Sequence, residues 1–149
     1  MDYIDKKLLT LLQQNSRMSI KQLADKVFLS SPSVAARIKI LKDEGVILGY
    51  TTIIDPVKLE YHITAFINLE VDPKMKPEFY EAMRNWPNVL ECSCVTGVYS
   101  MLLKVAFHST VDLDNFIGIL QEYGHTQTQI VFASPISSRG IKILPGEEI

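Results

Sequence analysis

Residues 19–47 read SIKQLADKVFLSSPSVAARIKILKDEGVI, and this stretch decides how the beginning of the chain folds. Apolar residues recur at three- and four-residue intervals from Ile20 to Val27, which is typical of a helix with one buried face. Ser19 and Gln22 have the spacing of a capping box, in which each side chain accepts a hydrogen bond from the other residue's backbone N–H. We therefore expect a short amphipathic helix that begins directly after Ser19.

The same stretch contains a second expected helix, which follows an apolar turn at residues 28–29. Ser30 or Ser31 can cap its N-terminus, and Pro32 suits its first position, where a missing N–H costs nothing. Gly45 is the expected C-cap. The inward face comprises Val34, Ile38 and Leu41. Two short helices joined by a tight turn are typical of a helix-turn-helix, whose second helix enters the DNA major groove.

The outward face of this second helix carries hydroxyl, methyl and guanidinium groups, which can approach base edges and phosphates. Arg37 can make a bidentate contact, and Ser31 and Ser33 can reach a phosphate from the start of the helix. The expected DNA-binding residues are Lys21, Ser30, Ser31, Ser33, Ala36, Arg37, Lys39, Ile40 and Lys42. Two capped helices also occur in helical bundles, so a protein-interaction role stays open on this pattern alone.

The charge of the chain is unevenly distributed. The net charge is -2, but residues 1–50 hold 8 Lys and Arg against 5 Asp and Glu, a net of +3. The remainder holds 7 positive and 12 negative residues, a net of -5. Only the front part therefore attracts phosphate. A surplus of three charges binds DNA weakly, so we expect affinity to come from several copies acting on one double-stranded DNA.

Membrane segments and catalytic groups are not expected. The sequence has no run of about 18 apolar residues, and residues 1–7, MDYIDKK, have no apolar stretch after their charges. We expect a cytoplasmic protein without a membrane partner. Catalysis needs a clustered acid, base or nucleophile, and no such cluster is visible, so we expect neither an enzyme nor a cofactor.

Cys92 and Cys94 are the only cysteines. Their spacing on a strand points both side chains to one face, together with Leu90. We expect a buried, reduced pair. A metal site is not expected, because the sequence has no second cysteine pair and no histidine at ligand spacing.

The head of the chain is completed by a helix expected at residues 2–14, with Asp2 or Asp5 at the positive end of its dipole. Three helices in this length make a compact domain of winged-helix type, residues 1–50. Residues 46–54 are β-branched and extended in character, which fits either a strand pairing back as a wing or a linker leading away. Asp55-Pro56 ends this segment, and residues 51–61 form the expected connection.

From residue 62 the apolar period changes to two, which indicates a strand ending at Asp72-Pro73. A helix opening at Pro77, strands at 89–96 and 101–107, a helix capped by Thr110 and a last strand at 126–134 follow. This βαββαβ order predicts an α+β chain whose residues 62–135 form a ferredoxin-like domain. We expect the uncovered sheet face to be apolar and buried against a second copy, giving at least a homodimer. The tail, residues 136–149, either lies along a neighbour or is partly disordered.

The arrangement resembles the leucine-responsive and asparagine-synthesis regulator (Lrp/AsnC) family, also called feast/famine regulators, over nearly the whole chain. The similar segments are Ile4 to Leu9, Asn15 to Ser19, Leu29-Ser30, Arg37, Gly45 to Tyr50, Ala65-Phe66, Val95 to Tyr99, Leu102-Leu103, and Thr126, Thr128 and Ile130-Val131. The resemblance implies a transcription regulator that dimerises through its sheets and commonly assembles to octamers.

The resemblance also implies a small effector, usually an amino acid, bound in clefts between dimers. The corresponding positions are Gly97, Val98, Tyr99, Ser100, Thr126 and Thr128. The family commonly has an aspartate where this chain has Ser100, and a carboxylate suits an amino acid's ammonium group. We therefore expect weakened or absent binding of ordinary amino acids, or a different effector. The Gly97 turn can also be read simply as a tight hairpin at an assembly interface.

A competing hypothesis remains open at this point. The ferredoxin-like domain could bind small molecules on its own account, with the helical head serving as a protein-interaction module.

Overall fold

The computed structural model describes residues 1–144 and divides the chain into two compact units. The first, which we call the head, comprises Met1–Ile53 together with residues 137–144, and the second, the body, comprises Ile54–Ile136.

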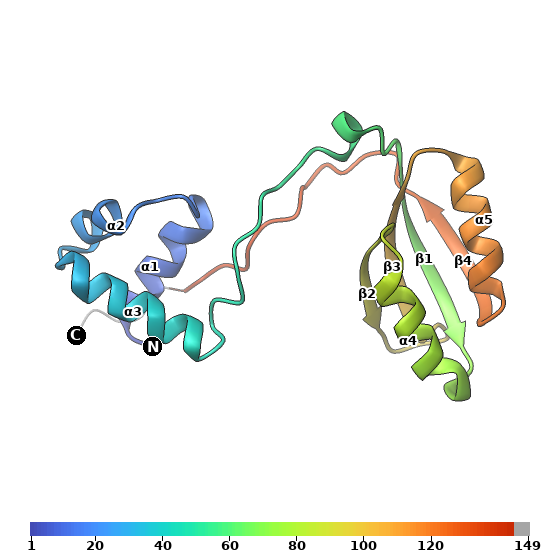
Figure 1. Cartoon of the computed structure of the whole chain (residues 1–149), viewed down its shortest axis with the longest axis horizontal. Helices are drawn as coiled ribbons and strands as arrows, with labels where there is room; N and C mark the ends of the chain where they lie inside the picture. The colour runs from blue at the N-terminus through green and yellow to red at the C-terminus, as the bar shows by residue number, and fades with distance from the viewer. Residues whose placement is uncertain (145–149) are drawn as a thin grey trace. The chain divides into compact units, whose positions relative to one another are not determined.

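The head contains three helices, α1 (Tyr3–Gln14), α2 (Ile20–Val27) and α3 (Ser31–Asp43) (Figure 1). Capping boxes begin α1 at Asp2 and α2 at Ser19, and the Ser30 side chain caps α3. One apolar core holds the three helices together, formed by Leu8, Leu12, Leu23, Ala24, Val27, Val34 and Ile38. The expected helix-turn-helix is confirmed, except that Pro32 occupies the second helical position because the helix begins at Ser31.

A Schellman motif ends α3. The N–H of Val46 donates to the carbonyl of Leu41, the N–H of Gly45 donates to the carbonyl of Lys42, and Gly45 has φ +70°. This is the pattern that a glycine just beyond a helix end produces, since glycine enters the left-handed region without a Cβ penalty. Residues 48–55 form no strand, so the linker alternative describes this segment and a wing strand is not formed.

The described part of the tail belongs to the head. Ile141, Ile143 and Leu144 line a cavity of about 750 Å³ together with α1 and the segment after α3. Gly140 lies so close to α1 that a Cβ on it would come within 2.7 Å of the Gln13 side chain. Residues 145–149 of the expected tail lie outside the described residues.

The body is a four-stranded antiparallel sheet with two helices on one face (Figure 1). Its elements are η1 (Pro56–Leu59), β1 (Ile63–Val71), η2 (Pro73–Met75), α4 (Lys76–Asn85), β2 (Val89–Cys94), β3 (Met101–Phe107), α5 (Thr110–Gln121) and β4 (Gly124–Ile130). The strand order is β2-β3-β1-β4. The predicted α+β class and βαββαβ order are therefore confirmed, although Ser109 rather than Thr110 caps α5, and the last strand runs from Gly124 to Ile130.

The face opposite the helices is more polar than expected. The registers place Phe66 and Leu102 there, but they also place Thr64, Asn68, Glu70, Glu91, Ser93, Lys104, His125, Gln127 and Gln129 on it. The alternating apolar residues of β1 and β3 are instead buried in the core between the sheet and the helices α4 and α5. The prediction of a largely apolar open face was therefore wrong.

Burial of the two cysteines was also predicted wrongly. Cys92 and Cys94 are free thiols and both are exposed. The reason is topological, because β2 is an edge strand and has a neighbour on one side only.

Candidate nucleic-acid interface

The outward face of α3 is accessible to a partner. Ser31, Ser33, Ala36 and Ile40 are exposed, while Val34, Ile38 and Leu41 point into the head. Ile40 adds an apolar side chain that is 53% exposed. A helix of 13 residues is about 20 Å long and about 10–12 Å wide with its side chains, which suits a major groove about 12 Å across.

The hydroxyl groups at the start of α3 differ in the hydrogen bonds that they already make. The Ser30 Oγ accepts the N–H of Ser33 at 3.3 Å and lies 2.8 Å from the Ser33 Oγ. Within residues 1–144, the side chains of Ser31 and Lys21 make no hydrogen bond. Ser31 is therefore the hydroxyl on this helix start with its full capacity left for a ligand.

Two lysines of α3 make only weak interactions with their neighbours. Lys39 forms an exposed ion pair with Asp43 one turn later. The Lys42 amine lies 5.0 Å from the centroid of the Tyr50 ring. Exposed ion pairs and cation–π contacts of this kind each contribute about 1 kcal/mol or less, so either lysine can exchange its partner for a phosphate.

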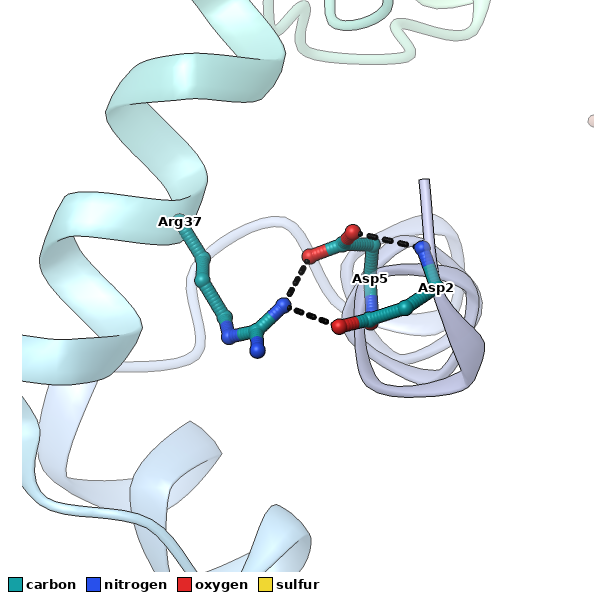
Figure 2. A network of polar contacts seen from close by, with 3 residues as sticks. All are labelled: Asp2, Asp5 and Arg37. Carbon is teal, nitrogen blue, oxygen red and sulfur yellow. Dashed lines mark hydrogen bonds and ion pairs between the residues drawn. The ribbon is translucent and has the colours of Figure 1, made fainter. Parts of the chain in front are cut away.

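Arg37 has a partner that the sequence did not indicate. Its Nη1 donates to the Asp2 Oδ2 at 2.7 Å and to the Asp5 Oδ1 at 2.8 Å (Figure 2). The two carboxylates also complete the capping box of α1, since each accepts the backbone N–H of the other residue. We call this three-residue arrangement the Arg37 clasp; it ties α3 to the start of α1.

The clasp favours the charged forms of its members. The hydrogen bonds to Asp5 and then Asp2 raise the pKa of Arg37 above its ordinary value. The N–H of Asp5, followed by the hydrogen bond from Arg37, lowers the pKa of Asp2. Among the described residues the Arg37 Nε and Nη2 donate no hydrogen bond, so these two nitrogens remain for a nucleic acid. Sequence separations of 35 and 32 residues leave no local signal for such a contact.

A second group of predicted residues gathers in the body around the turn between β2 and β3. Gly97 has φ +115°, and the Val98 side chain is exposed. Ser100 fastens this turn to β1, because its N–H donates to the Leu69 carbonyl at 3.1 Å and its Oγ accepts the Val71 N–H at 3.1 Å. The hydroxyl that stands in place of a carboxylate is therefore already used as an acceptor.

The threonines of β4 lie across the same end of β1. Thr126 is paired with Leu69 and Thr128 with Ile67. Tyr99 of the turn stacks on His125 with ring centroids 6.3 Å apart. Tyr99 and Ser100 thus lie at the same end of β1 as Thr126, with Thr128 two residues further along. The register places both threonines on the helix face of the sheet and His125, on which Tyr99 stacks, on the opposite face. The sequence gave no reason to select His125.

Other kinds of site find little support in the described residues. Among residues 1–144, no three His, Cys, Asp or Glu side chains gather in a way that could hold a metal ion. In the same part of the chain, no helix has the length and apolar character needed to span a membrane.

Comparison with known proteins matches each of the two units to a known family. Residues 1–47 match the family described as winged helix-turn-helix DNA-binding, and residues 64–141 match the one described as Lrp/AsnC ligand binding domain. The HTH-type transcriptional regulator YezC of Bacillus subtilis is 39% identical over 134 residues, which cover 90% of this chain and 95% of that protein.

Solved structures agree with these matches. The Bacillus subtilis LrpC structure superposes with a TM-score of 0.87 at 28% identity, covering 93% of this chain and 99% of that chain. A transcriptional regulator of Neisseria meningitidis, solved as its L-Met complex, gives a TM-score of 0.86 at 28% identity, covering 97% and 96%.

The competing hypothesis of a protein-interaction head is not favoured, because the head itself matches a DNA-binding family. The relatives are transcription regulators and not enzymes. The chain belongs to the Lrp/AsnC family of helix-turn-helix transcription regulators.

Proposed function

We propose that this regulator binds specific DNA sequences as a multimer and that a small effector bound between dimers modulates it. The observation that carries the first part is the exposed outward face of α3, held in a fixed position by two capping boxes, a Schellman motif and the Arg37 clasp. The proposed interface comprises Lys21, Ser30, Ser31, Ser33, Ala36, Arg37, Lys39, Ile40 and Lys42. The side chains of Ala36 and Ile40 would meet base edges, Ser31 would reach a phosphate from the start of the helix, and the three lysines would neutralise further phosphates.

Multivalent binding follows from the modest charge of the head. A net of +3 over residues 1–50 supports few phosphate contacts per copy. Joining two heads makes the second binding event intramolecular and raises the overall affinity. We therefore propose a homodimer that assembles further, to an octamer, with half-sites about one helical turn, roughly 34 Å, apart. Exposed Leu90, Val98 and Phe132 border the sheet and are available for contacts between copies.

The effector site that we propose comprises Gly97, Val98, Tyr99, Ser100, Thr126 and Thr128. The relative solved with L-Met supports an amino acid or a related metabolite as the class of effector. Ser100 offers an ammonium group one neutral oxygen, which already accepts the Val71 N–H, so the attraction that a carboxylate supplies is missing. The effector of this chain should therefore bind without relying on a cationic group at that position.

The DNA-binding proposal is tested by selecting duplexes from a random pool with the purified full chain and then measuring affinity by fluorescence anisotropy. Lys21→Ala should weaken binding to all sequences alike and reduce the salt dependence. Lys74→Ala is the matched control, because Lys74 is an exposed lysine of the body. Enrichment of no common motif, or equal losses in the two variants, would contradict the proposal.

The effector proposal is tested by measuring thermal stability and particle size in the presence of each of the twenty amino acids and related metabolites. We expect at least one compound to raise the melting temperature or change the assembly. Ser100→Asp should improve the binding of amino acids that carry a free ammonium group. Strong stabilisation of the unmodified chain by a cationic amino acid would contradict the argument from Ser100.

As a DNA-binding regulator with bacterial and archaeal relatives, the protein is expected to act in the cytoplasm.

A further inference from the structure

Four sulfur-containing residues line one cavity at the β2 edge of the sheet, and two of them, Cys94 and Met101, flank the turn discussed above. A cavity of about 330 Å³ there is lined by Cys92 and Cys94 of β2, Met83 of α4 and Met101 of β3. The two methionines are buried, and the two cysteines are exposed free thiols. Arg84 lines the same cavity. None of these residues takes part in the proposed DNA interface or effector site.

The register places both thiols on one side of the sheet. Cys92 is paired with Leu103 and Cys94 with Met101, and both partners belong to the core under the helices. Residues two apart on a strand have Cα atoms about 6.6 Å apart, near the upper limit of about 6.8 Å for a disulfide. A metal ion between two thiolates spans more, because two bonds of about 2.3 Å separate the sulfur atoms by about 4.6 Å. The spacing therefore suits a bridging ion better than a disulfide.

The charges of the two thiolates also favour a bridging ion. Two neighbouring thiolates repel each other unless a cation lies between them. When a monovalent cation binds two thiolates, two protons leave and the complex carries one negative charge. Arg84, which lines the same cavity, would compensate that charge, whereas the Glu91 carboxylate of the same lining already pairs with Lys104.

The donor set selects the class of metal. Thiolate and thioether sulfur favour soft ions such as Cu(I), whereas Mg²⁺ and Ca²⁺ prefer oxygen. Structural zinc takes four nitrogen or sulfur ligands, and two exposed thiols do not supply them. We infer that Cys92 and Cys94 form a two-coordinate site for a soft monovalent cation, Cu(I) or Ag(I), with the Met83 and Met101 thioethers lining the cavity behind them.

The test uses the reduced full chain under anaerobic conditions, titrated with Cu(I) against a chromophoric Cu(I) chelator, with proton release measured in weak buffer. We expect one ion per chain and two protons released per ion. Cys92→Ser and Cys94→Ser should each lower the affinity by about 100-fold or more, and Arg84→Gln should lower it by about 10-fold. Because both cysteines are exposed, the serine variants should keep the melting temperature of the parent chain.

Three outcomes would overturn the inference. The first is unchanged affinity when both cysteines are replaced by serine. The second is a stoichiometry of one ion per two chains, which would place the ion between copies instead of within one strand. The third is competition by Zn²⁺ at equal concentration, which would remove the preference for a soft monovalent ion. Ser93→Ala serves as a control and should bind like the parent, because Ser93 lies between the two cysteines but on the opposite face of the strand.

Discussion

Replacing Arg37 with alanine removes both ion pairs that tie α3 to the start of α1 (Figure 2). Most of the effect should come from Asp5, whose side chain is 14% exposed, whereas that of Asp2 is 52% exposed. A hydrogen bond to a charged group contributes about 1.5–3 kcal/mol, and an exposed ion pair contributes about 0–1 kcal/mol. Arg37 is itself one-third exposed, so the lower end of the first range applies after allowance for solvent screening.

We therefore expect Arg37→Ala to lower the free energy of unfolding of the head by about 1.5 kcal/mol. In a unit of this size, 1 kcal/mol corresponds to roughly 4–8 °C, so the melting temperature of the head should fall by about 6–12 °C. Arg17→Ala is the matched control. It removes the same charge from the same unit, and the Arg17 side chain is exposed.

Two spectroscopic signals separate the units. Trp86 is the only tryptophan and belongs to the body, where its ring lies 5.0 Å from that of Phe116, so its fluorescence reports on the body. Far-ultraviolet circular dichroism includes the three helices of the head. Arg37→Ala should shift the dichroism transition and leave the fluorescence transition unchanged.

A double-mutant cycle with Asp5→Asn completes the test, and its coupling energy should be about 1 kcal/mol. DNA affinity should then be measured well below the melting temperature. If Arg37 also reads a base through its remaining nitrogens, Arg37→Ala weakens specific binding by about 1–3 kcal/mol. An unchanged affinity would remove Arg37 from the interface. Zero coupling with Asp5, together with an unshifted head transition, would refute the clasp.

Three further perturbations follow from the backbone and the charges. Asp2→Asn should flatten the pH dependence of head stability in acid. The contribution of Asp2 to stability is complete above its unfolded pKa of about 3.9 and is lost as the pH falls through the lowered pKa of the folded state. The same change in melting temperature from pH 5 to pH 3 in the parent chain and in the variant would contradict this. Gly124→Ala should cost about 3 kcal/mol in urea denaturation, because its Cβ would lie 1.8 Å from the Glu70 carbonyl oxygen, whereas Gly118→Ala in α5 should stabilise by about 1 kcal/mol. Phe28→Gly should raise head stability by about 0.5 kcal/mol, because Phe28 is 89% exposed and has φ +58°, a left-handed conformation that strains a residue with a Cβ. A lower melting temperature of the variant would mean that the Phe28 side chain makes a contact that contributes more than this strain costs.

Features encoded within one or two turns were predictable from the sequence. The Ser19 capping box and the Gly45 helix end depend on residues three to five apart, so their spacing alone indicated them. The same holds for the strand at Ile63–Val71, whose apolar residues alternate. The order of these elements was then sufficient for the fold class.

Features that depend on which strands become neighbours were not predictable in this way. Cys92 and Cys94 look like core residues in a short apolar run, but the strand that carries them lies at the sheet edge. The composition of the open face likewise depends on how β1 and β4 align, which places Gln127 and Gln129 beside Asn68 and Phe66.

The candidate sites show the same division. The exposed positions on α3 followed from helical periodicity, and the effector positions followed from family resemblance. The Arg37 clasp joins residues more than 30 apart, and the acceptor role of Ser100 depends on a bond to Val71 across strands. Neither leaves a trace in local spacing.

Because the tail packs with the head, the body is an insertion within a discontinuous unit. A fragment that stops at Tyr50, the obvious choice for studying DNA binding in isolation, would lose Ile141 and Ile143 and bare Leu9 and Leu12 to water. Such a truncated head should aggregate more readily and should be less stable than the head within the full chain. Conversely, a protease cut near Leu48 should not release the head at once, since the severed piece is still held by the returning end of the polypeptide.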